Sequence, residues 1–98
     1  MPSKENAYQS RLIKTIEHMI PDCIVTKMDS GHIQGIPDLL VLYKDRWAVL
    51  EVKRGARESR QPNQQYYIDL FSDWSFASFI FPENEDLVLE SMFSYLVD

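Results

Sequence analysis

The sequence predicts an α/β fold in which a mixed sheet is flanked by helices. Three observations lead to this prediction. Apolar residues recur at helical spacing near both ends of the chain, four apolar segments have the length of strands, and a helical segment separates the last two of them. Of the 98 residues, 45% are apolar, which is enough for one compact core. We therefore expect a single domain that spans residues 1–98.

The first predicted element is a helix over residues 3–20. Its apolar side chains follow helical spacing at Tyr8, Leu12, Ile16 and Met19. Ser3 is a suitable N-cap, and Pro21 ends the helix.

Two further helices are predicted over residues 62–71 and 83–96. Pro62 suits the first turn of the second helix. The last helix begins with acidic residues, which complement the helix dipole: Glu83, Glu85 and Asp86. The apolar stripe of this helix faces inward and consists of Leu89, Met92, Phe93 and Leu96.

Four strands are predicted over residues 23–28, 38–43, 47–53 and 74–81. The second is almost wholly apolar, which is typical of a strand buried on both faces. Lys44 and Asp45 form the turn between the second and third strands. Residues 54–61 form a polar connection to the second helix, which crosses over to the fourth strand.

Charge is distributed unevenly along the chain, whose net charge is −5. All ten Lys and Arg residues lie in residues 1–60, whereas residues 61–98 contain seven acids and no Lys or Arg. The strip 44–60 holds six basic residues against three acids, and such a local surface attracts phosphates despite the negative total. The single cysteine, Cys23, excludes an internal disulfide, and no apolar run is long enough to span a membrane. We therefore expect a cytoplasmic protein.

Two acids and a lysine are predicted to meet at one edge of the sheet. Glu51 and Lys53 are two residues apart in a strand, so their side chains leave the same face. If Lys44 and Asp45 are a two-residue hairpin loop, Asp38 lies directly opposite Glu51. A three-residue loop, 44–46, would instead set Asp38 opposite Val52 and separate the two acids, unless a bulge restored them.

This juxtaposition favours metal-dependent hydrolysis. Two adjacent carboxylates repel each other unless a cation lies between them, and oxygen ligands suit Mg²⁺ or Mn²⁺ better than zinc. Lys53 adds positive charge beside that ion. A phosphodiester held between metal and lysine is open to attack by water.

Together these features make the chain resemble the PD-(D/E)XK nuclease superfamily, and within it the VRR-NUC-type domains. The resemblance rests on four features in the family's order: Glu5 with Gln9, Gly35-Ile-Pro-Asp38, Leu50-Glu-Val-Lys53 and Pro62-Asn-Gln64. It implies a restriction-endonuclease-like α-β-β-β-α-β core, here followed by a C-terminal helix. The Val-Arg-Arg run that gives the family its name is absent.

The resemblance also implies a role for each matching residue. Asp38 and Glu51 would ligate the metal, with the Val52 carbonyl as a third ligand and Glu5 approaching directly or through water. Lys53 would orient the water or stabilise the pentacovalent phosphate. Gln64 would position the site or a phosphate.

The function expected from these features is a Mg²⁺- or Mn²⁺-dependent DNA endonuclease. Freestanding relatives resemble four-way-junction (Holliday junction) resolvases, so we expect a homodimer that cuts branched DNA in repair or recombination. The small size and lone-domain character favour a phage or mobile-element origin. Aromatic residues crowd the C-terminal third and suit an isologous interface: Phe71, Trp74, Phe76, Phe79, Phe81, Phe93 and Tyr95. The DNA contacts expected from the basic strip and the glycine loop are Lys44, Arg46, Arg54, Arg57, Arg60 and His32.

Two alternatives stay open. One is a nuclease-like module that binds DNA or a protein without cutting, although juxtaposed carboxylates near phosphate disfavour it. The other is a catalytic fragment that a helicase or recombinase must bring to its substrate.

Overall fold

The computed structural model describes residues 4–98, with side chains from Asn6 onward. The elements along the chain are α1 (Lys4–Met19), β1 (Ile24–Lys27), β2 (Leu39–Tyr43), β3 (Arg46–Val52), α2 (Pro62–Trp74), β4 (Phe76–Ile80) and α3 (Glu85–Val97). The predicted order of helices and strands is confirmed, and so is the mixed α and β architecture. The predicted N-cap Ser3 lies outside the described residues.

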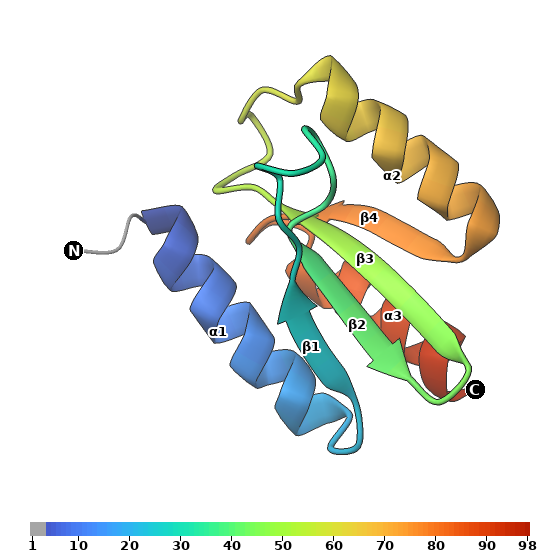
Figure 1. Cartoon of the computed structure of the whole chain (residues 1–98). Helices are drawn as coiled ribbons and strands as arrows, with labels where there is room; N and C mark the ends of the chain where they lie inside the picture. Colours follow the sequence, from blue (N-terminus) through green and yellow to red (C-terminus); the bar gives the residue numbers. More distant parts are fainter. Residues whose placement is uncertain (1–3) are drawn as a thin grey trace.

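The four strands form one sheet in the order β1-β2-β3-β4. β1, β2 and β3 are antiparallel neighbours, whereas β4 runs parallel to β3. A parallel pair needs a crossover, and α2 provides it, as the sequence predicted (Figure 1).

The β2–β3 hairpin has the two-residue loop on which the predicted site depends. Tyr43 pairs with Arg46, so that only Lys44 and Asp45 lie between the strands. Lys44 has a positive φ of 55°, which short hairpin loops commonly require. The three-residue alternative is therefore excluded.

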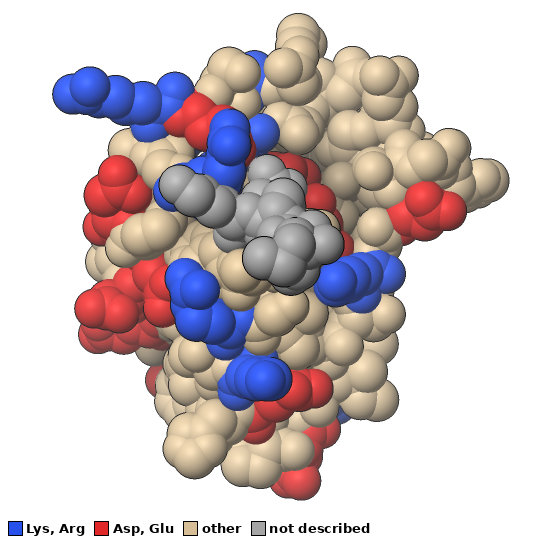
Figure 2. All heavy atoms as spheres, turned by 90° about the vertical axis from the view of Figure 1, so that its left-hand side faces the viewer, with Lys and Arg blue, Asp and Glu red and all other residues tan. Residues whose placement is uncertain are grey.

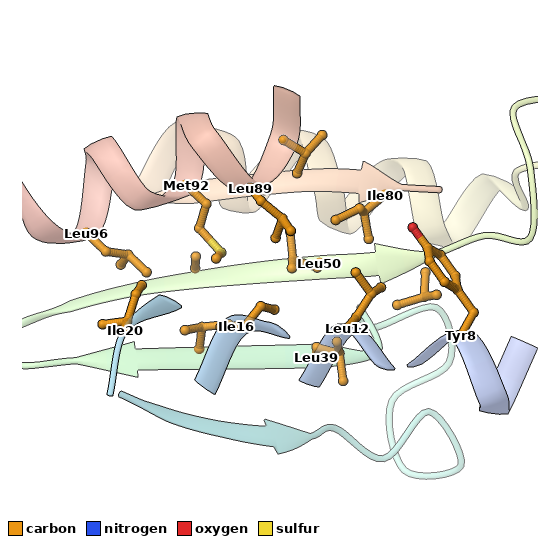
Figure 3. Packing of buried hydrophobic residues seen from close by; sticks show 14 residues of the cluster. Tyr8, Leu12, Ile16, Ile20, Leu39, Leu50, Ile80, Leu89, Met92 and Leu96 are labelled. Carbon is orange, nitrogen blue, oxygen red and sulfur yellow. The ribbon is translucent and has the colours of Figure 1, made fainter. Parts of the chain in front are cut away.

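The main core lies between one face of the sheet and the helices α1 and α3. Buried side chains of α1, including Leu12 and Ile16, meet Leu39 and Leu50 of the sheet and Met92 of α3 (Figure 3). Alternate residues of each strand point to this face, as the period of two requires. The helix α2 packs on β3 and β4 with its buried residue Ile68 outside this cluster, so it covers the opposite face of the sheet.

The prediction that the second strand is buried on both faces is wrong. Leu39 and Val41 are fully buried against the core, but Leu42 is 39% exposed. The reason is that α2 lies over β3 and β4 and leaves the β1–β2 half of that face uncovered.

The boundary between the second helix and the last strand also differs from the prediction. Trp74 is the last residue of α2 rather than the first residue of a strand, because the helix continues until the N–H of Ser75 bonds to the carbonyl of Phe71 at 2.8 Å. Glu83 lies before α3, and its carboxylate accepts a hydrogen bond from the N–H of Ala56. Within residues 4–98, no helix combines the length and apolar character needed to cross a membrane.

Candidate active site

A polar hollow of about 550 Å³ lies where β2 begins and β3 ends. It is bounded by the loop before β2, the end of β3 and the first turn of α2. Its lining includes Asp38, Glu51, Lys53 and Gln64. These are the four residues predicted to be catalytic, and the structure places all of them around one space.

The hairpin register brings the two carboxylates to neighbouring positions. Leu39 pairs with Leu50, so the residue before Leu39 lies opposite the residue after Leu50. That places Asp38 opposite Glu51, on the face of the sheet that α2 covers. The side chain of Asp38 is held in place because its Oδ2 accepts the N–H of Val52 at 2.8 Å.

The same hydrogen bond defines where the backbone of Val52 points. In an antiparallel pair, the N–H and the C=O of one residue face the same neighbouring strand. Because the Val52 N–H points to Asp38, its carbonyl is directed to that side too. The direction of these backbone groups alternates along a strand, so the N–H of the next residue, Lys53, points the other way and donates to the carbonyl of Ile80 in β4 at 2.8 Å.

Lys53 is a buried lysine with an organised set of oxygen acceptors. Only 5% of the residue is exposed. Its Nζ donates to Oε1 of Gln64 at 2.6 Å and to the carbonyl of Ser59 at 3.1 Å. Oε2 of Glu58 lies 3.8 Å away. A buried ammonium needs such partners to offset the loss of hydration, and an ammonium with three N–H donors retains capacity for a phosphate oxygen or a water.

Gln64 connects the lysine to a carboxylate. Its Oε1 faces the ammonium of Lys53, and its Nε2 donates to Oε2 of Glu51 at 3.4 Å. This amide orientation sets an acceptor against the cation and a donor against the anion. Oε1 also accepts a hydrogen bond from the N–H of Gln61, the N-cap of α2, at 3.0 Å. This bond holds the side chain of Gln64 in place at the start of the helix.

The loop before β2 approaches α2 closely at Gly35. This glycine has a φ of +90°, and a Cβ placed on it would lie 2.3 Å from Cβ of Asn63. Glycine therefore permits both the backbone conformation and the contact with the helix. The N-terminal end of α2, which carries the positive end of the helix dipole, borders the hollow. The first turn of α2 contains no acidic residue that would neutralise this partial positive charge.

The residues predicted to contact DNA do not form one continuous surface. Lys44 and Arg46 lie at the hairpin end of β3, about 16–17 Å along the strand from Glu51. The guanidinium of Arg46 donates to the carbonyl of Tyr95 at 2.5 Å. The strip 44–60 is thus divided by β3, and its two ends lie apart.

The other predicted contacts are exposed and lie on loops around the hollow, but they are not part of its lining. Arg54 pairs with Glu58 at 2.7 Å, and Arg60 lies 4.1 Å from the centre of the Phe79 ring. Arg57 and His32 are exposed. Figure 2 shows the α1 side of the molecule, where Lys and Arg side chains are dispersed with Asp and Glu side chains between and around them.

The side chain of Glu5, a predicted metal ligand, lies outside the described residues. Among the side chains from Asn6 onward, no three His, Cys, Asp or Glu residues converge in a way that suits a metal ion. Two carboxylates, those of Asp38 and Glu51, are the acidic side chains among the described residues that line the hollow.

The sequence did not indicate the partners that surround Lys53. The Ser59 carbonyl is a backbone group and has no signal in a sequence, and no pattern distinguishes Glu58 from the other acids of the strip 44–60. Asn63 and Gln34 also line the hollow. Asn63 could have been found from its place beside Gln64, but Gln34 lies in a loop with no regular pattern.

Comparison with solved structures finds a chain described as "VRR_NUC domain". The likeness has a TM-score of 0.73 and covers 91% of this chain and 97% of that chain, with 24% sequence identity. Comparison of the sequence with protein-family models gave no match, and comparison with curated proteins gave none either. The chain thus has the fold of a VRR-NUC-type nuclease domain, which confirms the predicted resemblance at the level of fold.

Proposed function

We propose that this VRR-NUC-type nuclease fold is an active one: residues 1–98 form one domain that hydrolyses phosphodiester bonds of DNA with the help of a divalent metal. The observation that carries the proposal is the convergence of Asp38, Glu51 and Lys53 on one hollow. Two buried or half-buried carboxylates beside a buried ammonium are costly to maintain without a function for them.

The donor set around the hollow fits Mg²⁺ or Mn²⁺. Asp38 and Glu51 offer carboxylate oxygens, and the Val52 carbonyl is directed to the same side as Asp38. Hard divalent ions prefer such oxygen ligands and keep several waters, so two carboxylates and one carbonyl suffice. Glu5 is proposed as a further ligand, directly or through water. When bound, the ion polarises a phosphate oxygen and lowers the pKa of water.

Lys53 is proposed to stabilise the charge that develops on the phosphate. Its ammonium is desolvated and is held in one place by Gln64 and Ser59, so it need not reorganise during the reaction. Gln64 is proposed as a positioning residue, because its amide links the ammonium to Glu51. Loss of either hydrogen bond of Gln64 would allow the distance between the Lys53 ammonium and the Glu51 carboxylate to change.

The proposed substrate is branched DNA, such as a four-way junction, cut by a homodimer in the cytoplasm during repair or recombination. The support is the absence of a base-reading element among the described helices and strands, which favours recognition of shape and backbone. The exposed Arg54, Arg57 and Arg60 lie on the connection that leads from Lys53 to α2, and they are proposed to contact backbone phosphates.

A nicking and cleavage assay tests the proposal. Supercoiled plasmid and a synthetic four-way junction are incubated with Mg²⁺, Mn²⁺ or EDTA. We expect cleavage with either metal, none with EDTA, and a loss of at least about a hundredfold in Lys53→Ala with DNA binding retained. The matched control is Lys14→Ala, which removes an exposed lysine of α1 and should leave cleavage unchanged.

The outcomes separate the proposed enzyme from its rival. DNA binding that EDTA does not change, without cleavage of either substrate in any metal, would identify a binding module and overturn the proposal. Cleavage that survives Lys53→Ala would overturn the role given to the lysine.

A further inference from the structure

Two of the proposed phosphate contacts share one carboxylate of the chain itself. Oε1 of Glu58 accepts a hydrogen bond from the Nε–H of Arg54 at 2.7 Å. Oε2 of the same carboxylate lies 3.8 Å from Nζ of Lys53. Arginine binds carboxylate and phosphate oxygens in the same way, through short charge-assisted hydrogen bonds. The carboxylate of Glu58 therefore lies against both cations that a DNA backbone would approach beside the hollow.

The two contacts of Glu58 differ in strength. A distance of 2.7 Å to Arg54 is typical of a charge-assisted hydrogen bond, whereas 3.8 Å to Lys53 is too long for any hydrogen bond. Within the described part of the chain, Nζ of Lys53 donates to Gln64 and to Ser59. Since an ammonium has three N–H donors, it can take one further oxygen acceptor on the side that Glu58 approaches only loosely.

The position of Glu58 allows a ligand to displace its carboxylate. Residues 54–61 connect β3 to α2 without helix or strand, and Glu58 is held there by a turn in which its N–H donates to the carbonyl of Gly55 at 3.2 Å. The side chain of Glu58 is 17% exposed and that of Arg54 is 63% exposed. An ion pair that water reaches in this way contributes little to stability, so a more highly charged anion can replace it.

A backbone phosphate and the Glu58 carboxylate cannot both occupy this place. A phosphate oxygen bound to Arg54 or Lys53 would lie within a few ångströms of Glu58, and two anions at that distance repel each other. Glu58 does not line the hollow, so its carboxylate leaves the place of hydrolysis open. The conflict therefore concerns the rim of the hollow, where Arg54 is proposed to contact the DNA backbone.

A purely structural role for Glu58 fits the distances less well. Such a role would be to neutralise the buried ammonium of Lys53, and it calls for a direct hydrogen bond to Nζ. The carboxylate instead forms its short bond with Arg54, which is the more exposed of the two cations. The buried ammonium already has Gln64 and Ser59 as acceptors.

We propose that Glu58 determines the affinity of the chain for DNA: in the free protein its carboxylate takes the place between Arg54 and Lys53 that a backbone phosphate takes in the complex, and DNA displaces it. This inference rests on the proposed function, because that function makes Arg54 and Lys53 phosphate contacts. The carboxylate lowers the affinity for any polyanion that lacks enough contacts elsewhere to displace it.

The test is equilibrium binding of a fluorescent four-way junction in EDTA, which prevents cleavage, over a range of salt concentrations. Glu58→Gln removes the charge and keeps the length of the side chain. We expect this variant to bind at least about threefold more tightly than wild type, the range of one partly exposed charge pair. The slope of log affinity against log salt should become steeper by about 0.9, which corresponds to one additional phosphate contact.

Glu83→Gln is the matched control. It removes the same charge from a residue whose carboxylate contacts the same loop, through the N–H of Ala56, and which has no ion pair with Arg54 or Lys53 in the described structure. This variant should bind the junction as wild type does. Urea unfolding of each variant confirms that it folds, and Glu58→Ala replaces Glu58→Gln if that variant does not.

The outcomes separate this inference from the proposed function. Equal or weaker binding by Glu58→Gln, beside a wild type that cleaves DNA, would overturn the inference alone. An equal gain in Glu83→Gln would also overturn it, because net charge would then explain the effect. Tighter binding by Glu58→Gln without cleavage in any metal would overturn the proposed function and leave the inference standing. Absence of DNA binding in every variant would overturn both.

Discussion

Substitution of Gly35 by alanine is predicted to destabilise the fold at the wall of the hollow. Gly35 has a φ of +90°, and an added Cβ would lie 2.3 Å from Cβ and 2.8 Å from the carbonyl carbon of Asn63. Real Cβ atoms do not approach other carbons this closely. Since the Asn63 atoms belong to the first turn of α2, relief requires the loop or the helix to move.

The size of the effect follows from three contributions. A left-handed backbone conformation costs an alanine about 1–2 kcal/mol. Forcing a methyl group into an occupied space costs about 1–3 kcal/mol. Alanine also restricts the conformations of the unfolded chain more than glycine does, which offsets the destabilisation by about 0.4–1 kcal/mol. We therefore expect the free energy of unfolding to fall by about 1–4.5 kcal/mol in Gly35→Ala, with a central value of about 3 kcal/mol.

Urea denaturation measures this change. The midpoint should fall while the slope stays constant, because the surface exposed on unfolding is the same. Gly55→Ala is the control: its Cβ would meet only the Glu83 carboxylate at 3.6 Å, an ordinary contact, so its stability should change by less than about 0.5 kcal/mol. DNA cleavage should also weaken in Gly35→Ala, since displacement of Asn63 moves Gln64. A midpoint for Gly35→Ala equal to that of Gly55→Ala would refute the packing argument.

Three further predictions concern other parts of the chain. Gln64→Ala should lower the free energy of unfolding by about 1.5–3 kcal/mol and the cleavage rate at least tenfold, because Lys53 loses its 2.6 Å charge-assisted hydrogen bond. Gln65→Ala removes only an exposed hydrogen bond to Asp69 and should change neither quantity. Urea unfolding and plasmid cleavage of the two variants measure these effects. Burial and a hydrogen bond to Glu85 raise the pKa of Tyr8, so wild-type stability should decline as pH rises above about 10 and decline less in Tyr8→Phe; equal pH profiles in alkaline urea titrations would contradict this. Lys44→Gly should raise the thermal midpoint by relieving a φ of 55°, and a lower midpoint would show that no strain is stored there.

Much of the candidate site could be predicted because it depends on local rules. Alternation along a strand puts Glu51 and Lys53 on one face, and a two-residue loop determines the pairing of every residue back to Asp38. Both rules act over a few residues and need no knowledge of distant contacts. The first turn of α2 followed in the same way from Pro62.

Other features could not be predicted because they arise from packing between distant segments. The exposure of Leu42 depends on which strands α2 covers, and nothing within β2 encodes this. Trp74 has strand propensity but extends the helix, where its ring packs on Phe71. Propensity is a weak preference, and a well-placed aromatic contact outweighs it.

Amino-acid order along the chain was thus sufficient for the order of the elements and for placing Glu51 and Lys53 on one face of a strand, whereas it left two hairpin registers open, of which the structure has the one that sets Asp38 opposite Glu51. Folding in three dimensions was needed to surround Lys53 with Gln64, Ser59 and Glu58, to press Gly35 against α2, and to leave Leu42 exposed. The reason is physical, because periodicity and turn length act between neighbours in sequence. Burial and ion pairing depend instead on which distant surfaces pack against each other. Sequences with the same local pattern can pack these surfaces in different ways.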